Sequence, residues 1–398
     1  MLLAAGLAFD LAFGLMPAPA FAAPSACAVL ARQVDEAGPK NSKGPVFVVS
    51  YPTATDKALK GVAFLYYNAA AALALTGCGD TAHAKRIGDA ILVALDHDRF
   101  WKDGRLRNGY LAGPVAKPAA LGGWQGKDGW IEDGYQAGSD TGNMAWAMLA
   151  LLGLHHAGAG GKYLHGAERI ARFVEKPFSN PGFTGGTFGG EPRPQRNTWK
   201  STEHNVDLAA AFAALARATH SDHWAMRARD ARAFVDAMWR KDCGCFAVGT
   251  GLDGKTLNTF LALDAQIWPL LAFGTKTYGD ALTVARERML VDGGFAYSQA
   301  RGGVWTEGTA QAALLAKVMG RPRDAARLMA IVERARAPGG AYYASDRDAA
   351  TGFRLDTDTS QERRYFHIPH LGATAWAALA ARGFNPFTFA AAGAAAGN

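Results

Sequence analysis

The sequence has few charged residues, and none of its basic residues form a stripe. Charged side chains make up 19% of the 398 residues, and the formal charge is +7. Scattered lysines and arginines argue against a nucleic-acid-binding surface, although a weak attraction to acidic polymers is compatible with the charge. Because 49% of the residues are hydrophobic, the chain can form a large core and is not globally disordered. We therefore expect a globular protein that does not bind nucleic acid.

The sequence has one long apolar run, the alanine-rich residues 2–16 at the N-terminus. No later stretch reaches the ~20 apolar residues that a spanning helix needs. The small-x-small pattern Ala20-Phe21-Ala22 is typical of a signal-peptidase site, although a basic leader is lacking and Asp10 interrupts the apolar run. We predict a signal peptide over residues 1–22, no stable membrane span after its cleavage, and a periplasmic or secreted protein.

Cysteine is scarce, with only Cys27, Cys78, Cys243 and Cys245 in the chain. Their spacing supports no zinc site, and we expect neither a metal nor another cofactor. An oxidising compartment permits a Cys27–Cys78 disulfide. We expect Cys243 and Cys245, separated by one glycine, to be too close to bridge easily.

Helical periodicity, by contrast, runs through almost the whole chain. Six alanine- and leucine-rich helices, apolar on every side, are expected to begin near Thr55, Thr141, Thr202, Leu263, Thr306 and Gly372. They alternate with six amphipathic segments at 26–36, 82–97, 162–176, 221–239, 279–291 and 322–336. Since all-apolar helices are buried and amphipathic ones face solvent, the pattern predicts an all-α (α/α)6 toroid of six helical hairpins. We expect one catalytic domain over residues 23–388 and a disordered tail over 389–398.

Glycine- and aromatic-rich segments precede the apolar helices. Examples are "FWKDGRLRNGYL", "FSNPGFTGGTFGG" and "GGAYYASDRDAATGF". Such segments form loops and short β-hairpins, and their positions place them together on one face of the ring. Loops that a rigid scaffold gathers on one face often form the functional site.

Five of the apolar helices can be aligned without gaps. Their second column holds Gly142, Glu203, Asp264, Glu307 and Gly372. The column four residues later holds Trp146, Asp207, Trp268, Gln311 and Trp376. The alignment predicts three carboxylates at one height, where the loops gather, with a layer of tryptophans one turn deeper.

Helix capping is the alternative explanation of acids at helix starts, because a carboxylate there accepts free N–H groups and opposes the macrodipole. It suits Asp140, which we interpret as an ordinary N-cap. It does not explain Glu203, Asp264 and Glu307 inside a ring of alanines and leucines, where carboxylates would repel each other and lose solvation. An acidic, tryptophan-lined pocket therefore favours a functional site.

Tryptophan faces stack on sugar rings, and carboxylates catalyse the cleavage of acetals. Trp199 and Trp305 flank Glu203 and Glu307, and Trp130 lies in a preceding loop. Neighbouring helices stand ~8–10 Å apart. This spacing suits the ~6.5–9.5 Å between the carboxyl groups of an inverting glycosidase better than the ~5 Å of a retaining one.

Five stretches together resemble the six-hairpin glycosidase superfamily, which contains many bacterial endoglucanases and other polysaccharide hydrolases. They are "DTGNMAWAMLALL", "WKSTEHNVDLAAAF", "LDAQIWPLLAFG", "GVWTEGTAQAALL" and "HLGATAWAALAARGFNPF". The resemblance covers the whole mature chain and implies the (α/α)6 fold and glycan chemistry. It identifies no particular family, so its catalytic residues transfer only as the acids of the aligned column.

The sequence thus predicts an exported glycoside hydrolase, acting as a monomer on a polysaccharide or oligosaccharide that is β-glucan-like or an exopolysaccharide. Glu203, Asp264 and Glu307 are the expected catalytic carboxylates, with Glu203 as the general acid and either of the others holding the water. The expected substrate-binding residues are Asp207, His204, Trp199, Trp305, Trp130, Gln311, His367 and His370.

Three alternatives share the fold. A sugar epimerase would use a histidine pair drawn from His204, His367 and His370. A polysaccharide lyase would use Tyr365 or His367 with Arg364, although Arg363 and Arg364 also fit an ordinary solvated loop pair. The third is an inactive glycan-binding protein.

Overall fold

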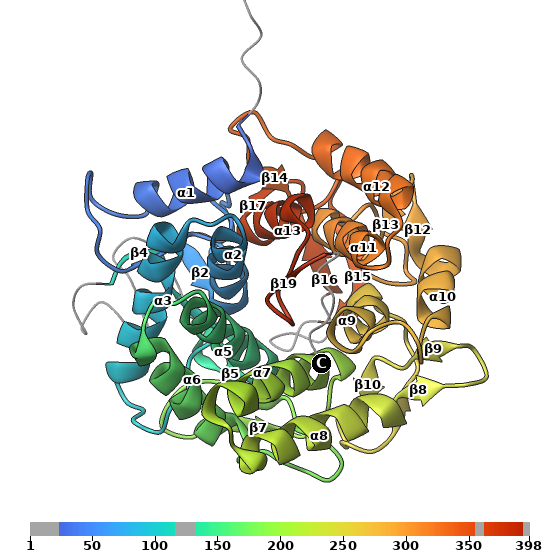
Figure 1. The fold of residues 1–398 in the computed structure, drawn as a ribbon, viewed down its shortest axis with the longest axis horizontal. Helices are drawn as coiled ribbons and strands as arrows, with labels where there is room; N and C mark the ends of the chain where they lie inside the picture. Colours follow the sequence, from blue (N-terminus) through green and yellow to red (C-terminus); the bar gives the residue numbers. More distant parts are fainter. Residues whose placement is uncertain (1–23, 116–131, 355–361, 393–398) are drawn as a thin grey trace, which may run out of the picture.

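The computed structural model describes residues 24–115, 132–354 and 362–392, and these form a double ring of helices (Figure 1). The inner ring comprises α2 (Leu65–Gly77), α5 (Thr141–His156), α7 (Thr202–Thr219), α9 (Leu263–Phe273), α11 (Thr306–Val318) and α13 (Leu371–Arg382). The outer ring comprises α1 (Ala26–Glu36), α3 (Thr81–Asp96), α6 (Gly161–Val174), α8 (Asp222–Ala237), α10 (Asp280–Met289) and α12 (Pro322–Arg334). One short helix, α4 (Gly134–Ala137), precedes α5. The predicted (α/α)6 toroid is confirmed.

The ring closes between the first and the last hairpin. Each inner helix packs against the next, from α2 through α5, α7, α9 and α11 to α13, and α13 returns to α2. Helix α1 covers this closure because it packs against both α13 and α2. Within the described residues, no helix is both long and apolar enough to cross a membrane.

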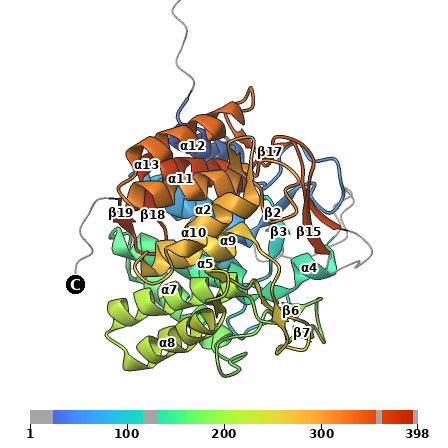
Figure 2. The ribbon, with the colours of Figure 1, turned by 90° about the vertical axis from the view of Figure 1, so that its right-hand side faces the viewer.

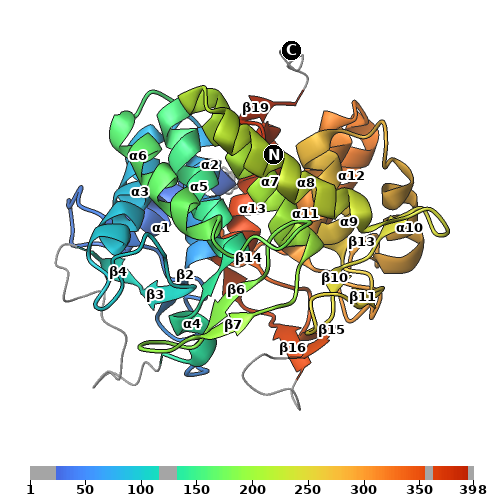
Figure 3. The ribbon, with the colours of Figure 1, turned by 90° about the horizontal axis from the view of Figure 1, so that it is seen from below.

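Short antiparallel strands gather mostly on the face from which the inner helices start, as Figures 2 and 3 show from the side and from below. The strands are β1 (Val46–Phe47), β2 (Val62–Phe64), β3 (Gly109–Leu111), β4 (Gly113–Pro114), β5 (Ser139–Asp140), β6 (Gly186–Phe188), β7 (Gln195–Asn197), β8 (Trp239–Arg240), β9 (Cys245–Phe246), β10 (Gly249–Thr250), β11 (Leu257–Asn258), β12 (Leu290–Val291), β13 (Gly294–Phe295), β14 (Tyr342–Tyr343), β15 (Ala349–Arg354), β16 (Glu362–Tyr365), β17 (Pro369–His370), β18 (Phe384–Asn385) and β19 (Ala390–Ala391). They pair as β1–β4, β2–β3, β5–β6–β7, β8–β9, β10–β11, β12–β13, β14–β17, β15–β16 and β18–β19. We call the strand-rich side the loop face.

A polar residue at the fourth position of five inner helices ties each helix to the segment before it. Asn205 accepts from the backbone N–H of Phe183 at 2.8 Å and donates to its carbonyl at 3.1 Å, and Gln266 bonds both backbone groups of Phe246 at 2.8 Å. The equivalent residues are Asn68, Thr309 and Thr374, bonded to Val48, Phe295 and Tyr342. Because buried backbone groups must be paired, this repeated bond fixes each loop against the start of the next helix.

The first inner helix begins ten residues later than predicted, at Leu65 instead of near Thr55. Residues 62–64 form β2, paired with β3, and the apolar run is therefore divided between a strand and a helix. The expected frayed tail is also wrong over residues 389–392, because Ala390 and Ala391 pair with β18. Residues 1–22, which hold the predicted signal, and 393–398 lie outside the described part.

All four cysteines are disulfide-bonded. Cys27 at the start of α1 bonds Cys78 at the end of α2, as the sequence permitted. Cys243 and Cys245 bond each other, which corrects the expectation that one intervening glycine makes them too close. The turn that reverses the chain between β8 and β9, with Gly244 at φ +61°, brings the two side chains together.

Replacing Cys27 and Cys78 together with serine is expected to lower the free energy of unfolding by about 2–4 kcal/mol. The bond closes a loop with a sequence separation of 51 residues, and its loss frees the unfolded chain. Urea denaturation of the double variant and the wild type measures the difference. Equal midpoints and slopes would show that the bond does not contribute to stability.

Candidate active site

A cavity of about 140 Å³ lies at the loop-face ends of the inner helices. We call it the acid pocket. Its lining residues are Tyr66, Tyr67, Tyr135, Asp140, Gly142, Asn143, Trp146, Trp199, Glu203, His204, Asp264, Trp268, Tyr297, Trp305, Glu307, Arg363 and Tyr365. All three predicted catalytic carboxylates are among them, and so are the predicted substrate-binding residues His204, Trp199 and Trp305.

The second residue of each inner helix faces this region, as the aligned column predicted. The glycines of the column make space for the functional side chains. A Cβ on Gly142 would stand 2.4 Å from the ring of His204, and one on Gly372 would stand 2.8 Å from Oε2 of Glu307. The sixth member is Tyr66, at the second position of α2, which the sequence alignment missed because it started this helix too early.

Glu203 and Asp264 are neighbouring carboxyl groups that interact with each other. Glu203 opens partly to the pocket but is otherwise enclosed by protein, and this enclosure, the charge of Asp264 and then that of Asp207 raise its pKa well above the usual value. Burial raises the pKa of Asp264 less, to about 6, because the backbone N–H of Ala265 donates to its Oδ1 at 2.7 Å. Glu203 therefore keeps its proton at a pH at which Asp264 is ionised.

Glu307 lies on α11, separated from α7 by α9, and accepts a hydrogen bond from Tyr66. The Nε1–H of Trp376 donates to the hydroxyl oxygen of Tyr66 at 2.8 Å, and the Tyr66 hydroxyl donates to Oε1 of Glu307 at 2.5 Å. Since an indole N–H can only donate, this chain directs the tyrosine proton to the carboxylate and favours its ionised form. Burial nevertheless raises the pKa of Glu307 to about 8.

His204 is the neutral base candidate on the α7 side. Burial lowers its pKa to about 4, and the charge of Arg363 adds to this. The Thr141 hydroxyl donates to the carbonyl of Thr184, so the contact of 3.2 Å between Thr141 Oγ1 and His204 Nδ1 is assigned as Nδ1–H donating. The Trp199 ring packs against the imidazole, with centroids 5.3 Å apart.

His370 lies behind Glu307 and outside the lining of the pocket. Its Nδ1 accepts from the backbone N–H of Ala373 at 3.2 Å and lies 3.9 Å from Oε2 of Glu307. Its ring stacks on Tyr51 and meets Tyr67 edge-on. Burial lowers its pKa to about 3, so it is neutral, and it lies behind two lining residues of the pocket, Glu307 and Tyr67.

Two lining residues were missed because the sequence offered a simpler explanation for each. Asp140, interpreted as an N-cap, makes no side-chain cap bond to α5 and lines the pocket, where Asn197 donates to it at 3.3 Å. Arg363, interpreted as one of a solvated pair, is half-buried on β16 and lines the pocket, whereas Arg364 is exposed. Arg363 on β16 comes from a long loop, so spacing alone could not place it, whereas Asp140 on β5 stands directly before α5.

The predicted tryptophan layer closes the pocket from below. Trp146, Trp268 and Trp376 are buried, and their rings pack on one another at 5.3–6.1 Å. Asp207 and Gln311 belong to the same layer; they lie below the pocket and do not line it. Within the described residues, their side-chain oxygens and the Gln311 nitrogen have no hydrogen-bond partner.

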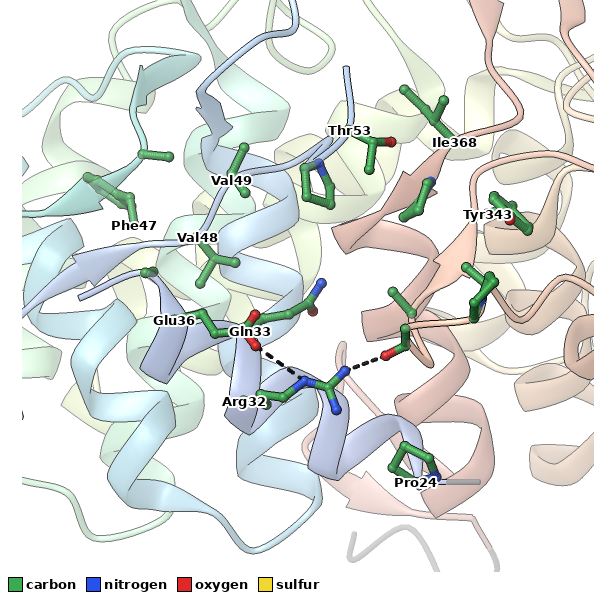
Figure 4. A pocket seen from close by; sticks show the side chains of 18 of the residues that line it. Pro24, Arg32, Gln33, Glu36, Phe47, Val48, Val49, Thr53, Tyr343 and Ile368 are labelled. Atoms are coloured by element: carbon green, nitrogen blue, oxygen red, sulfur yellow. Dashed lines mark hydrogen bonds and ion pairs between the residues drawn. The ribbon is translucent and has the colours of Figure 1, made fainter. Parts of the chain in front are cut away.

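Another predicted binding residue, His367, is not in the acid pocket. Trp130 lies outside the described residues. His367 is exposed and stacks on Tyr343, with centroids 4.1 Å apart, in a separate groove of about 1080 Å³. This groove lies at the closure of the ring, between α1 and the residues of 337–343 and 367–369 (Figure 4). Arg32 crosses part of it, paired with Glu36 and bonded to the carbonyl of Gly339.

No cluster of three or more histidine, cysteine or acidic side chains in the described part of the chain has the arrangement to hold a metal ion.

Comparison with known proteins supports the fold. No protein-family description and no curated protein matches the sequence. Among solved structures, a glycosidase in which a glutamate is replaced by alanine, in complex with glucose, has a TM-score of 0.63 at 15% identity over 90% of this chain and 94% of that one. An α-amylase from Clostridium perfringens has a TM-score of 0.63 at 10% identity, covering 90% and 98%. A cellobiose 2-epimerase from Bacillus thermoamylovorans has 0.58 at 12%, covering 88% and 95%. The chain therefore has the fold of both glycosidases and sugar epimerases.

Proposed function

We propose that the protein is an exported glycoside hydrolase that cleaves a polysaccharide or oligosaccharide with inversion. One observation carries the proposal: three inward-facing carboxyl groups with unequal environments share one aromatic pocket. Acid–base cleavage of an acetal needs one group that stays protonated and another that activates water. The signal-like pattern over residues 1–22 supports export.

Glu203 is the general acid of this proposal. Its enclosure and the two acidic neighbours keep its proton in place, and its partial opening to the pocket lets that proton reach a glycosidic oxygen. Asp264 takes the negative charge of the pair, which prevents ionisation of Glu203. In this proposal Asp264 keeps Glu203 protonated, and it is not the general base.

Glu307 is the general base. The bond from Tyr66 favours its ionised form, and Glu307 lines the pocket, where its carboxylate can take a proton from a bound water. Because α9 separates α7 from α11, Glu203 and Glu307 stand on different sides of the pocket. An inverting enzyme needs such a separation, since a water must fit between base and sugar.

The aromatic lining suits a sugar ring. Trp199 is half-exposed at the mouth, and Tyr297, Trp305 and Tyr365 form one side, with ring centroids 4.9–5.6 Å apart. Their faces offer apolar contact to the C–H groups of a sugar, while Asn143 and Asp140 offer hydrogen bonds to its hydroxyls. The inferred substrate is therefore a neutral glycan.

Sugar epimerisation is the second candidate, because two neutral histidines flank the carboxylates. Such a reaction needs bases that remove and return a proton on carbon, and the lowered pKa values keep both His204 and His370 unprotonated. The fold shared with an epimerase agrees with this. The position of His370 behind Glu307, outside the pocket lining, favours hydrolysis.

A panel of oligosaccharides and polysaccharides distinguishes the reactions by their products. Hydrolysis is expected, with new reducing ends and products that start with the inverted anomer in proton NMR. Conversion of the sugar into its epimer without cleavage would identify an epimerase. An unsaturated product that absorbs in the ultraviolet would identify a lyase. Binding without any reaction would leave a glycan-binding protein.

Replacing Tyr66 with phenylalanine is expected to move the acid limb of the pH profile of kcat/KM to higher pH. The base must be ionised, so kcat/KM should rise with pH through about 8, the pKa of Glu307, and fall where Glu203 loses its proton. The Tyr66 hydroxyl lowers the pKa of Glu307, so its removal raises that pKa further. Rates measured across pH on a confirmed substrate test this shift.

Tyr67 to phenylalanine is the matched control. Its hydroxyl lies 3.4 Å from that of Tyr51 and makes no bond to Glu307, so the acid limb should stay in place. If the acid limb of the pH profile stayed in place in the Tyr66→Phe variant, Glu307 would not be the general base.

A further inference from the structure

The size of the acid pocket limits what it can hold. At about 140 Å³ it is less than half the ~300 Å³ at the lower end of typical ligand pockets. The larger groove of about 1080 Å³ lies at the ring closure and is lined by none of the three carboxylates. Among the residues that the structure describes, the acids therefore do not stand in a cleft long enough for several sugar units.

Side chains from different parts of the ring close the pocket laterally. Trp199 and His204 pack together on the α7 side, and Trp305 and Tyr365 pack together on the α11 side. The floor is Trp146 packed on Trp268, with centroids 5.3 Å apart. An enzyme that cuts within a chain needs a site open at two ends, whereas in the described part of the chain these packed side chains close the floor and two sides of the pocket and leave an opening toward the loop face.

Arg363 narrows that opening. It extends from β16, whereas Tyr135 belongs to α4, and both elements lie on the loop face (Figure 3). The Arg363 guanidinium carbon lies 5.9 Å from the centroid of the Tyr135 ring, within the range of a cation–π contact. The positive charge of Arg363 also lowers the pKa values of Glu203, His204 and Asp264. Arg363 therefore lies close to the starts of α7 and α9.

We propose that the acid pocket accepts one terminal sugar unit, and that the protein is an exo-acting hydrolase that releases one unit per cleavage. This inference rests on the proposed hydrolase function and adds where on the chain the enzyme acts. The contact between Arg363 and Tyr135 is the barrier that keeps a second unit from extending across the pocket.

Glucan hexasaccharides of α and β linkage, tagged with a fluorophore at the reducing end, test the cleavage pattern. The expected result is stepwise shortening, with free monosaccharide from the first time point and the five-unit tagged product before any shorter one. Mid-length tagged products appearing first would overturn the inference while leaving the hydrolase function intact.

Binding gives a readout that does not depend on hydrolysis. With Glu203→Gln, tryptophan fluorescence should show that glucose and the hexasaccharides bind with affinities within about threefold of each other. If the wild type cleaves none of these sugars but the affinities for glucose and the hexasaccharides are equal within this range, the proposed hydrolase function is wrong and the one-unit pocket is supported. Affinity that rises tenfold or more with chain length, or no binding of any of these sugars, would overturn the one-unit pocket.

A pair of variants tests the barrier. Tyr135→Ala opens the contact with Arg363 and should raise hexasaccharide affinity relative to glucose at least threefold. Tyr343→Ala, in the groove at the ring closure, should leave the ratio unchanged. A Tyr135→Ala ratio equal to that of the wild type would show that this contact is not the barrier.

Discussion

Replacing Glu203 with glutamine is expected to lower kcat on a confirmed glycan at least about 100-fold, the usual scale of general acid catalysis. Glutamine keeps the shape of the side chain and its position beside Asp264 but cannot donate a proton to the leaving oxygen. The enclosure that raises the pKa of Glu203 shows that the protonated form is the one the site favours. Steady-state rates at the pH optimum measure the loss.

The folded structure and the sugar affinity are the controls for this variant. Because the neutral amide replaces a carboxyl group that is mostly protonated, the melting temperature and the dissociation constant for the sugar should change little. A rate close to that of the wild type would show that Glu203 only caps α7 or binds sugar. The role of acid would then pass to Glu307.

The repeat pattern made most of the fold predictable from the sequence. Apolar and amphipathic helices alternate six times, and a gapless alignment placed Glu203, Asp264 and Glu307 at one height because equivalent residues of equivalent helices occupy equivalent places in a ring. The same logic gave the buried layer of Trp146 and Trp268. Periodicity thus predicts whatever the repeats share.

Departures from the repeat could not be predicted in the same way. Residues 61–75 form one stretch without charged side chains, in which strand β2 passes directly into α2, so the boundary at Leu65 has no sequence signal. Because the start of the helix was uncertain, Tyr66 could not be assigned to the aligned column. With α2 beginning at Leu65, Tyr66 is the second residue of its helix, as Glu203 is of α7. Arg363 reaches the pocket through long-range contacts of a loop, which local patterns do not encode.

The two histidines of "YFHIPH" show how extended backbone separates neighbouring residues. His367 precedes β17 and faces the groove at the ring closure, where its Nδ1 bonds the carbonyl of Ser345 at 2.8 Å. His370, three residues later, is the last residue before α13 and turns inward to cap that helix. Neither histidine lines the acid pocket, and the two lie in different surroundings because residues an odd number apart point to opposite sides of an extended segment.

Replacing Trp268 with alanine is expected to lower the free energy of unfolding by about 3–5 kcal/mol, the usual cost of removing a large buried aromatic side chain. The ring is 1% exposed and packs against Trp146, Trp376 and Phe387, at 5.3, 6.1 and 5.6 Å between centroids. These partners come from three other parts of the ring, so they cannot all move to fill the space. Urea denaturation followed by circular dichroism measures the change.

Trp101 to alanine is the matched control, because this indole lies on an outer loop, is partly exposed and is mainly covered by Arg105. Its loss should cost about 1 kcal/mol or less, in line with substitutions outside the core. The Trp268 variant should also lose sugar binding, since Trp268 is part of the pocket floor, whereas Trp101→Ala should keep it. A Trp268 variant as stable as the wild type would show that the layer below the acids is not closed, and the one-unit pocket built on that floor would then lack its base.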